Sequence, residues 1–236
     1  LGMLPLLWGT LYISFIALAV AVPIGLFAAI FLSEYASSRV RSVAKPLIEI
    51  LAGIPTIVYG LFALITVGPM LRDYFAEPLG LGESASSVMT AGLVMGVMLI
   101  PFVSSLSDDI INAVPQSMRD GSLGLGATPS ETIRNVIMPA ALPGIVGAIL
   151  LAASRAIGET MIVSIAAGQQ PKMGFDLLSS METMTAYIVQ VSLGDTPQDT
   201  IEFRTIFAVG TLLFAMTFVM NLLGDWFVRR YREVYE

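Results

Sequence analysis

The sequence predicts an all-α membrane protein, a polytopic bundle of apolar helices. Of its 236 residues, 56% are hydrophobic and only 13% are charged, whereas a soluble domain carries about 25% charged residues. The mean hydropathy is +0.81. Several segments reach the roughly 20 apolar residues that are needed to cross a bilayer. Five spans follow from this pattern, at residues 7–32, 47–71, 87–112, 142–167 and 204–228.

Three of these spans contain helix-breaking residues. The first contains Pro23, the third contains Pro101, and the second is interrupted by the sequence GIPT at 53–56. Proline and glycine are tolerated in a span where neighbouring helices or local adjustments satisfy the freed backbone groups. We therefore expect kinked helices packed in a bundle. Each proline taken singly is equally compatible with an ordinary kink that has no functional role.

The basic residues between the spans predict the orientation, because loops rich in Lys and Arg lie in the cytoplasm. One side of the membrane receives eight basic residues, namely Arg39, Arg41, Lys45, Arg119, Arg134, Arg229, Arg230 and Arg232. The other side receives three, namely Arg72, Lys172 and Arg204. We therefore expect Leu1 to start outside, Glu236 to end in the cytoplasm, and a further span to precede the sequence.

The residue types that are missing argue against several classes of protein. Cys and His are absent, which removes disulfides, thiolate nucleophiles, histidine bases and the commonest zinc sites. The net charge of −6 argues against nucleic-acid binding, which leaves a basic footprint. No G-x-x-x-x-G-K-[ST] motif occurs, so we expect no ATP hydrolysis by this chain. We predict neither an enzyme nor a resident metal or cofactor.

The longest cytoplasmic connection, at about residues 113–141, predicts two short helices. Thr128 is a good N-cap, and Glu131 three residues later completes a capping box. This helix should end two residues before Pro139, because a proline disfavours the helical conformation of the residue that precedes it. A shorter helix is expected at about 116–123. The pair is either a surface linker on the lipid headgroups or a docking element for a soluble partner.

The same loop resembles the coupling motif of ABC importer permeases, E-A-A-x-x-x-G-x(9)-I-x-L-P. The spacing between the glycine and the proline is intact, while the E-A-A triplet is degenerate. The matching positions are Asp120, Gly121 and Ser122 for the triplet, Gly126 for the glycine, Val136 and Met138 for Ile and Leu, and Pro139 for the proline. The resemblance implies that this loop, with Glu131 in its second helix, docks on a separate ATPase.

The resemblance covers nearly the whole chain and is closest to the phosphate permeases, of the PstC-like type. It is carried by FLSEYAS (31–37), KPLIEILAGIPTIVYGLFAL (45–64), LSDDIINAVPQSMRDGSLGLGAT (106–128) and SRAIGETMIV (154–163). Related sulfate and molybdate permeases usually carry G-E-F where this chain has G-E-T, and the sister phosphate subunit usually continues with Ala-Pro. Both contrasts favour the PstC-like type.

The resemblance implies a MetI-like fold and a role in ATP-driven phosphate import across the bacterial inner membrane. The implied partners are a PstA-like second permease, a cytoplasmic ATPase dimer that binds ATP and Mg²⁺, and an extracytoplasmic phosphate-binding protein. The alternatives are a permease for sulfate or molybdate, or an ion-coupled secondary transporter with Glu159 as proton carrier. The latter would show an internal repeat, and none is evident in the sequence.

Arg155 and Glu159 are ionisable residues inside the predicted fourth span. Such a residue near mid-membrane costs roughly 2.5–3.5 kcal/mol and marks a functional site by default. Four residues apart, they would share one face of a continuous helix. They form either a buried ion pair that fixes packing, or a pathway site in which Arg155 binds the anion, Glu159 is its counter-ion and Thr160 lies beside them. One arginine is too little charge for a phosphate dianion, so a second cation from the partner permease is expected.

Overall fold

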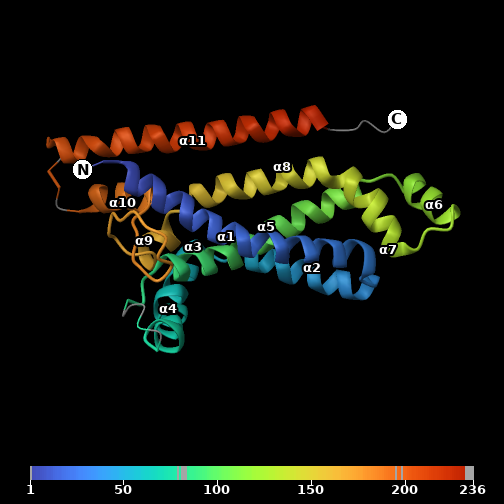
Figure 1. The fold of residues 1–236 in the computed structure, drawn as a ribbon, viewed down its shortest axis with the longest axis horizontal. Coiled ribbons are helices and arrows are strands. Elements are labelled where there is room, and N and C mark those ends of the chain that lie inside the picture. Colours follow the sequence, from blue (N-terminus) through green and yellow to red (C-terminus); the bar gives the residue numbers. More distant parts are fainter. Residues whose placement is uncertain (1, 79, 81–83, 195, 198, 232–236) are drawn as a thin grey trace.

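The computed structural model describes residues 2–78, 80, 84–194, 196–197 and 199–231, and the regular elements within these ranges are all helices. Most of them run along one long axis and form an elongated bundle (Figure 1). Symbols with η mark π-helical turns. The elements are α1 (Leu4–Ile30), η1 (Phe31–Tyr35), α2 (Ser38–Gly53), α3 (Thr56–Phe62), η2 (Ala63–Val67), α4 (Gly68–Leu71), η3 (Arg72–Ala76), α5 (Val88–Asn112), α6 (Gln116–Gly124), α7 (Pro129–Thr132), η4 (Ile133–Ile137), α8 (Met138–Ile157), α9 (Met161–Ala166), α10 (Met184–Leu193) and α11 (Ile201–Tyr231).

Five helical runs are long and apolar enough to cross a membrane. This finding confirms the predicted fold class, an all-α polytopic bundle. The five runs are Leu4–Tyr35, Thr56–Ala76, Val88–Asn112, Pro129–Ile157 and Ile201–Tyr231. The most deeply buried of them is α5, in which 67% of the apolar 18-residue stretch is buried by other parts of the chain. In α11 only 6% of the corresponding stretch is buried. The bundle is therefore built around α5, with α11 on its periphery against α8 and α10.

Helix α1 packs along α5 through glycines on both helices. A Cβ atom on Gly25 would lie 2.8 Å from the Cβ of Val103, and one on Gly92 would lie 2.7 Å from the Cγ2 of Ile16. Real Cβ atoms do not approach other atoms this closely. In lipid, small residues of this kind let two helices associate through close van der Waals contact. The glycines therefore set the distance between the two central helices.

The second span differs from the expected range of 47–71. Helix α2 ends at Gly53, and the apolar run of membrane length begins only at Thr56. The cause is Pro55, because Ile54 before it is extended (φ −68°, ψ 128°), as a residue preceding proline prefers. The interruption lies where the GIPT sequence predicts it. However, α2 is a separate helix with no residue buried within the chain.

The fourth span also differs from the expected range of 142–167, because its helical run is Pro129–Ile157. The prediction that Pro139 ends the cytoplasmic helix is wrong. Pro139 is the second residue of α8, just after the π-helical turn η4, and a local π-helical adjustment of this kind accommodates a proline inside a continuous helix. The helix therefore passes from the capping box at Thr128 into the membrane without ending.

The outer loop (residues 167–183) folds back onto the end of the bundle. Trp8 Nε1 donates to the carbonyl oxygen of Gly174 at 2.7 Å, and the backbone N–H of Met184 donates to Thr10 Oγ1 at 3.0 Å. Glu182 in this loop is 4% exposed. Its Oε1 has no hydrogen-bond partner among the described residues, and burial raises the pKa of its carboxyl group. The loop thus covers this end of the bundle, and its packing buries the carboxyl group of Glu182.

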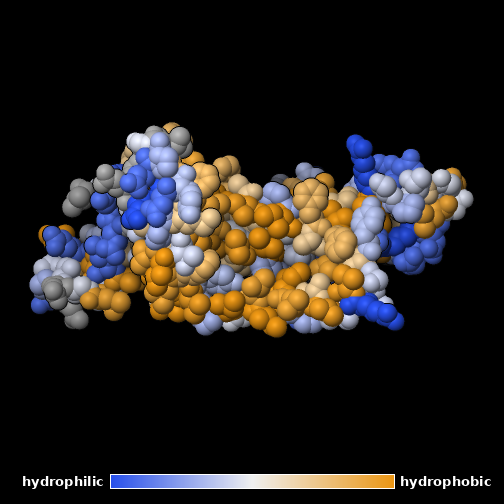
Figure 2. All heavy atoms as spheres, turned by 90° about the horizontal axis from the view of Figure 1, so that it is seen from below, coloured by the Kyte–Doolittle hydropathy of each residue, from blue (hydrophilic) through white to orange (hydrophobic). Residues whose placement is uncertain are grey.

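The two ends of the bundle are polar and the middle is apolar. Figure 2 shows an orange band between two blue ends. The end that holds the start of α2, the helices α6 and α7 and the end of α11 (Figure 1) carries most of the basic residues on which the orientation was predicted. Arg232, one of these residues, lies outside the described ranges. The basic residues therefore gather at one end, as a membrane orientation requires.

Candidate functional site

Two interrupted helices meet inside the bundle. Helices α2 and α3 are separated by residues 54–55, and α8 and α9 by residues 158–160. Helix α3 packs against α9, and a Cβ atom on Gly60 of α3 would lie 3.2 Å from the carbonyl oxygen of Met161 in α9. Interrupted helices expose backbone groups within the membrane, and such ends form substrate sites in many transporters. This junction is therefore the candidate site.

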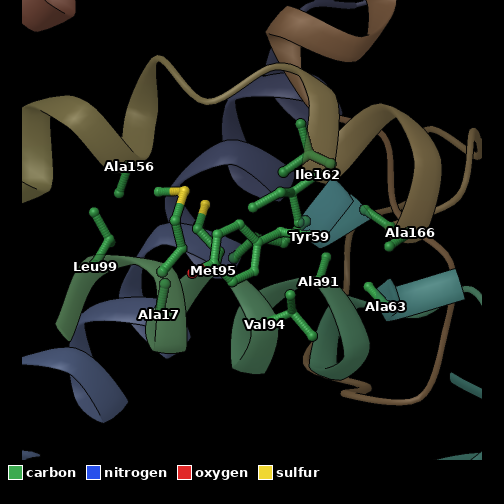
Figure 3. Close-up of a cluster of buried hydrophobic side chains, with 14 of the residues drawn as sticks. Ala17, Tyr59, Ala63, Ala91, Val94, Met95, Leu99, Ala156, Ile162 and Ala166 are labelled. Carbon is green, nitrogen blue, oxygen red and sulfur yellow. The ribbon is translucent and has the colours of Figure 1, made fainter. Parts of the chain in front are cut away.

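The break between α2 and α3 is closed by Tyr59. Its hydroxyl group donates to the carbonyl oxygen of Leu51, near the end of α2, at 2.8 Å. The ring packs in the core between α3, α5 and α9, where Figure 3 shows Tyr59 close to Met95 and Ile162. One of the carbonyl groups left without a partner at the end of α2 is thereby satisfied. Tyr59 therefore links the end of α2 to the span that begins with α3.

Glu159 closes the break between α8 and α9. Its Oε1 accepts hydrogen bonds from the backbone N–H groups of Met161 at 3.1 Å and Ile162 at 3.4 Å. Its own carbonyl oxygen accepts from Thr185 Oγ1 at 2.7 Å. The side chain is buried, with 8% of the residue exposed. The carboxylate thus caps the first turn of α9, where negative charge is favoured.

Arg155 and Glu159 are therefore not paired in this conformation. The prediction that they share one face of a continuous helix is wrong, because α8 ends at Ile157 and Glu159 lies in the break. Within the described residues, no carboxylate lies at ion-pair distance from Arg155. In this conformation Glu159 contacts the start of α9 and not Arg155; its role as a counter-ion in the pathway stays a prediction.

Arg155 lies in the last turn of α8 and is exposed on the surface of the chain. Its guanidinium carbon is 5.4 Å from the centroid of the Phe102 ring, a cation–π contact. Phe102 is ten residues before Asn112, the last residue of α5, which is about 15 Å along the helix. The hydrocarbon core is about 30 Å thick. Arg155 therefore presents an exposed cation beside the middle of α5, and this position is near mid-membrane depth if α5 spans the bilayer symmetrically.

Thr160, the third residue predicted in the pathway, lies in the break itself. Its hydroxyl group donates to the carbonyl oxygen of Gly158 at 3.3 Å, and its carbonyl oxygen accepts from Ser164 Oγ at 2.6 Å. The residue is half-buried. Its polar groups thus satisfy local backbone and side-chain partners in this conformation. Of the three predicted pathway residues, Arg155 is the one whose charged group is exposed.

The two helices predicted for the loop at 113–141 form at the basic end of the bundle. Helix α6 (Gln116–Gly124) agrees with the expected 116–123, and the capping box of Thr128 and Glu131 is present. Thr128 Oγ1 accepts from the N–H of Glu131 at 3.3 Å, and Glu131 Oε2 accepts from the N–H of Thr128 at 2.8 Å. Gly126 joins the helices with a positive φ of 91°, which favours glycine.

The residues of the resemblance to the coupling motif divide between two faces. Asp120 and Gly121 are exposed on α6, and Pro139 is exposed at the start of α8. Ser122 instead faces inward, where its hydroxyl group lies 2.9 Å from Thr132 Oγ1. Glu131 is exposed but is engaged by the capping box. Asp120, whose Oδ1 accepts from Gln116 Nε2 at 2.9 Å on the same helix, and Gly121 therefore lie on the face open to a partner, whereas Ser122 holds α6 against α7.

An ion-pair network at the cytoplasmic end of α5 was missed by the sequence reasoning. The side chain of Asp108 is 2% exposed and lies 3.0 Å from Arg41 and 3.1 Å from Lys45 of α2. Asp109 is 64% exposed and 3.3 Å from Lys45. The sequence signal that could have indicated this network is the spacing of Arg41 and Lys45, which places two cations on one face of a helix.

Within the described residues, no group of three or more Cys, His, Asp or Glu could hold a metal ion.

Comparison with known proteins identifies the family. Residues 21–233 match the model of the "Binding-protein-dependent transport system inner membrane component". The chain belongs to this permease family. Members of this family are transport subunits rather than enzymes. With its five apolar helical runs, this permease is a multi-pass membrane protein.

Relatives of known name agree with this assignment. The permease is 33% identical over 225 residues to the probable ABC transporter permease protein YqgH of Bacillus subtilis, covering 94% of this chain and 70% of YqgH. It is 33% identical over 245 residues to the phosphate transport system permease protein PstC 1 of Mycobacterium tuberculosis, covering 97% and 72%. It is 32% identical over 246 residues to PstC of Haemophilus influenzae, covering 98% and 77%.

Solved structures share the fold. A chain of the inward-facing MetNI methionine ABC transporter superposes with a TM-score of 0.71 at 19% identity, covering 98% of this permease and 96% of that chain. A chain of a bacterial ABC transporter that imports alginate gives 0.69 at 17% identity, covering 98% and 80%. The MetI-like fold and the resemblance to PstC-like permeases are thereby confirmed.

Proposed function

We propose that this permease forms the translocation pathway for inorganic phosphate together with a second, PstA-like permease. The observation that carries the proposal is Arg155, a cation near mid-membrane depth that is exposed and has no carboxylate partner in the described part of the chain. A charge in this position is costly in lipid. It is accounted for if the face that bears it lines a polar pathway between two subunits.

The chemistry of Arg155 suits phosphate. The guanidinium group is planar and offers parallel N–H donors that match two oxygens of a tetrahedral oxyanion. Phe102 beneath the guanidinium group leaves its N–H edges free for an anion. A single positive charge does not balance a dianion, so the partner permease would supply at least one more cation. Because Glu159 is engaged in capping α9, it does not compete with the anion for Arg155.

The remaining partners follow from the same proposal. Asp120 and Gly121 on α6 would dock on a cytoplasmic ATPase dimer that binds ATP and Mg²⁺, and the basic end of the bundle would face the cytoplasm of a bacterium, with the C-terminus inside. An extracytoplasmic phosphate-binding protein would deliver the anion at the end that carries the outer loop. The PstC relatives, the family's binding-protein-dependent transport and the ABC transporters that share the fold support this assembly.

The experiment is reconstitution of the permease with its partner permease, ATPase and binding protein in proteoliposomes. Phosphate should stimulate ATP hydrolysis and be taken up, and Arg155→Ala should abolish uptake while the complex still assembles. Arg155→Lys should retain only part of the uptake, because it keeps the charge but loses the planar fork. Arg230→Ala removes an exposed arginine in the last turn of α11, outside the pathway and the docking loop, and serves as the control. Normal uptake by Arg155→Ala would disprove the ligand role.

A second candidate is a permease for sulfate or molybdate. The arginine fork fits any tetrahedral oxyanion, and the name of YqgH states no substrate. The same proteoliposomes discriminate the two functions when each oxyanion is offered with its own binding protein. Stimulation of ATP hydrolysis by sulfate or molybdate, with none by phosphate, would replace the phosphate proposal with this one.

A further inference from the structure

Arg119 fastens α6 to two membrane spans at once. It lies on the inner face of α6, and its side chain is 14% exposed. One terminal nitrogen donates to the Glu34 carboxylate in the π-helical turn that ends the first span. The other donates to the carbonyl oxygen of Ile111 near the end of α5, at 2.8 Å. A single guanidinium group thus joins α6 to α1 through η1 and to α5.

Both ends of this contact are sheltered from water. The Glu34 side chain is 11% exposed, and its Oε1 also accepts from Ser33 Oγ at 3.4 Å. Beside it, Met118 of α6 packs on the apolar cluster that contains Ile111 and Ile137. A charge pair with so little solvent around it is weakly screened, and losing one partner leaves a buried charge. The contact therefore resists sliding of α6 over the spans.

The opposite face of α6 has no such attachment. Asp120, Gly121 and Leu123 are exposed, and Leu125 just after the helix is 92% exposed. Helix α6 therefore has one face fixed to the spans and one face open for a partner. Three side chains fix this face: Met118 makes apolar contact, Ser122 bonds to Thr132, and Arg119 makes the charged bonds to η1 and α5. A push on the open face therefore reaches the spans through these side-chain contacts as well as through the short backbone connection to α5 at residues 113–115.

We propose that Arg119 and Glu34 are positioning residues that transmit movement of α6 to α1 and α5. This inference rests on the proposed docking of α6 on an ATPase. When the ATPase moves α6, the forked contact of Arg119 carries the ends of both spans along. Helices α1 and α5 are already joined by their glycines, so they move as one body. Without the contact, ATP hydrolysis continues and the pathway switches less often.

The test measures transport per ATP hydrolysed in proteoliposomes that contain the complete transporter. The variants are Arg119→Gln and Glu34→Gln, which each remove one charge and keep a polar side chain; Glu34→Gln also preserves the side-chain size. The oxyanion used is whichever stimulates the wild-type complex. Each variant should keep substrate-stimulated ATP hydrolysis and lose about tenfold in transport per ATP, within the range of about 5- to 150-fold that is typical of coupling between sites. Arg229→Gln is the matched control, because it disrupts an exposed ion pair with Asp225 at the same end.

Charge reversal separates a specific contact from general damage. Glu34→Arg and Arg119→Glu each place like charges together, and the double variant restores an ion pair. Transport per ATP in the double variant should exceed the value in either single variant, although it should stay below wild type because Glu at position 119 cannot donate to Ile111. The interaction term of this double-mutant cycle measures the contact.

Three outcomes would overturn the inference. The first is wild-type transport per ATP in both Gln variants, and the second is a double reversal that equals the product of the single effects. The third is failure of both Gln variants to co-purify with the ATPase while Arg229→Gln does, because the contact would then serve docking. If the wild-type complex responds to sulfate or molybdate instead of phosphate, the phosphate proposal fails, whereas the ratio measured with that anion still decides the inference.

Discussion

Replacing Glu159 with Ala or Gln distinguishes a capping role from a charge role. The carboxylate accepts two backbone N–H groups at 3.1 and 3.4 Å in a buried break. Removing an N-cap acceptor costs about 0.5–2 kcal/mol, and hydrogen bonds to charged groups are worth about 1.5–3 kcal/mol. We expect Glu159→Ala to lower the free energy of unfolding by about 2 kcal/mol. Glu159→Gln keeps an acceptor oxygen and should lose about half as much.

These values convert to melting temperatures. For a chain of this size, 1 kcal/mol corresponds to about 2–4 °C. Glu159→Ala should therefore lower the Tm of the purified permease by about 4–8 °C, and Glu159→Gln by about 2–4 °C. Glu49 is exposed, and its substitution by Ala should leave the Tm unchanged. Equal losses for the Ala and Gln variants would refute the capping argument. So would a Gln variant that melts like wild type but does not transport, because the charge itself would then be required.

Three further predictions concern other contacts in the bundle. Gly9→Ala should lower the free energy of unfolding by about 1–3 kcal/mol, because the added Cβ atom would lie 2.3 Å from the carbonyl oxygen of Glu182. An unchanged Tm would contradict the close packing of the outer loop on α1. Asp108→Ala should cost about 1.5–3 kcal/mol, the value of hydrogen bonds to charged groups, because its partners Arg41 and Lys45 are partly exposed and are not left as buried charges. Asp109→Ala should cost almost nothing, and similar Tm values for the two variants would contradict the network with Lys45. Burial raises the pKa of Glu182 above 4.5, so its contribution to stability is full below about pH 4.5 and is lost as the pH rises through the raised pKa. Glu182→Gln should flatten this decline in a Tm-versus-pH series, and an identical slope in wild type would disprove it.

The all-helical membrane fold could be predicted from the sequence because the length and apolar composition of its segments determine it. Apolar runs long enough to cross a bilayer must be helical where no water satisfies the backbone, and Pro55 locates the first interruption. The cytoplasmic helices were also predictable, since the capping box of Thr128 and Glu131 is a local signal. These features depend on residues close together in the chain.

The break after Ile157 could not be predicted from local pattern. Residues 142–167 read as one continuous apolar helix, and only the folded chain brings the hydroxyl group of Thr185 to the carbonyl of Glu159. The position of Asp108 has the same origin, because its partners Arg41 and Lys45 belong to another helix. Polar residues in apolar segments are placed by tertiary partners, which the spacing of residues along one helix does not reveal.

The close approach of α1 and α5 also determines how these helices can change during evolution. Gly92 fits against Ile16, and Gly25 fits against Val103, so the size of one member of each pair limits the size of the other. A larger residue at position 92 would be accommodated only where position 16 has become smaller, and the same holds for positions 25 and 103. In homologous permeases, a larger residue at one position of a pair should therefore accompany a smaller residue at the other. The summed side-chain volume of each pair should stay nearly constant.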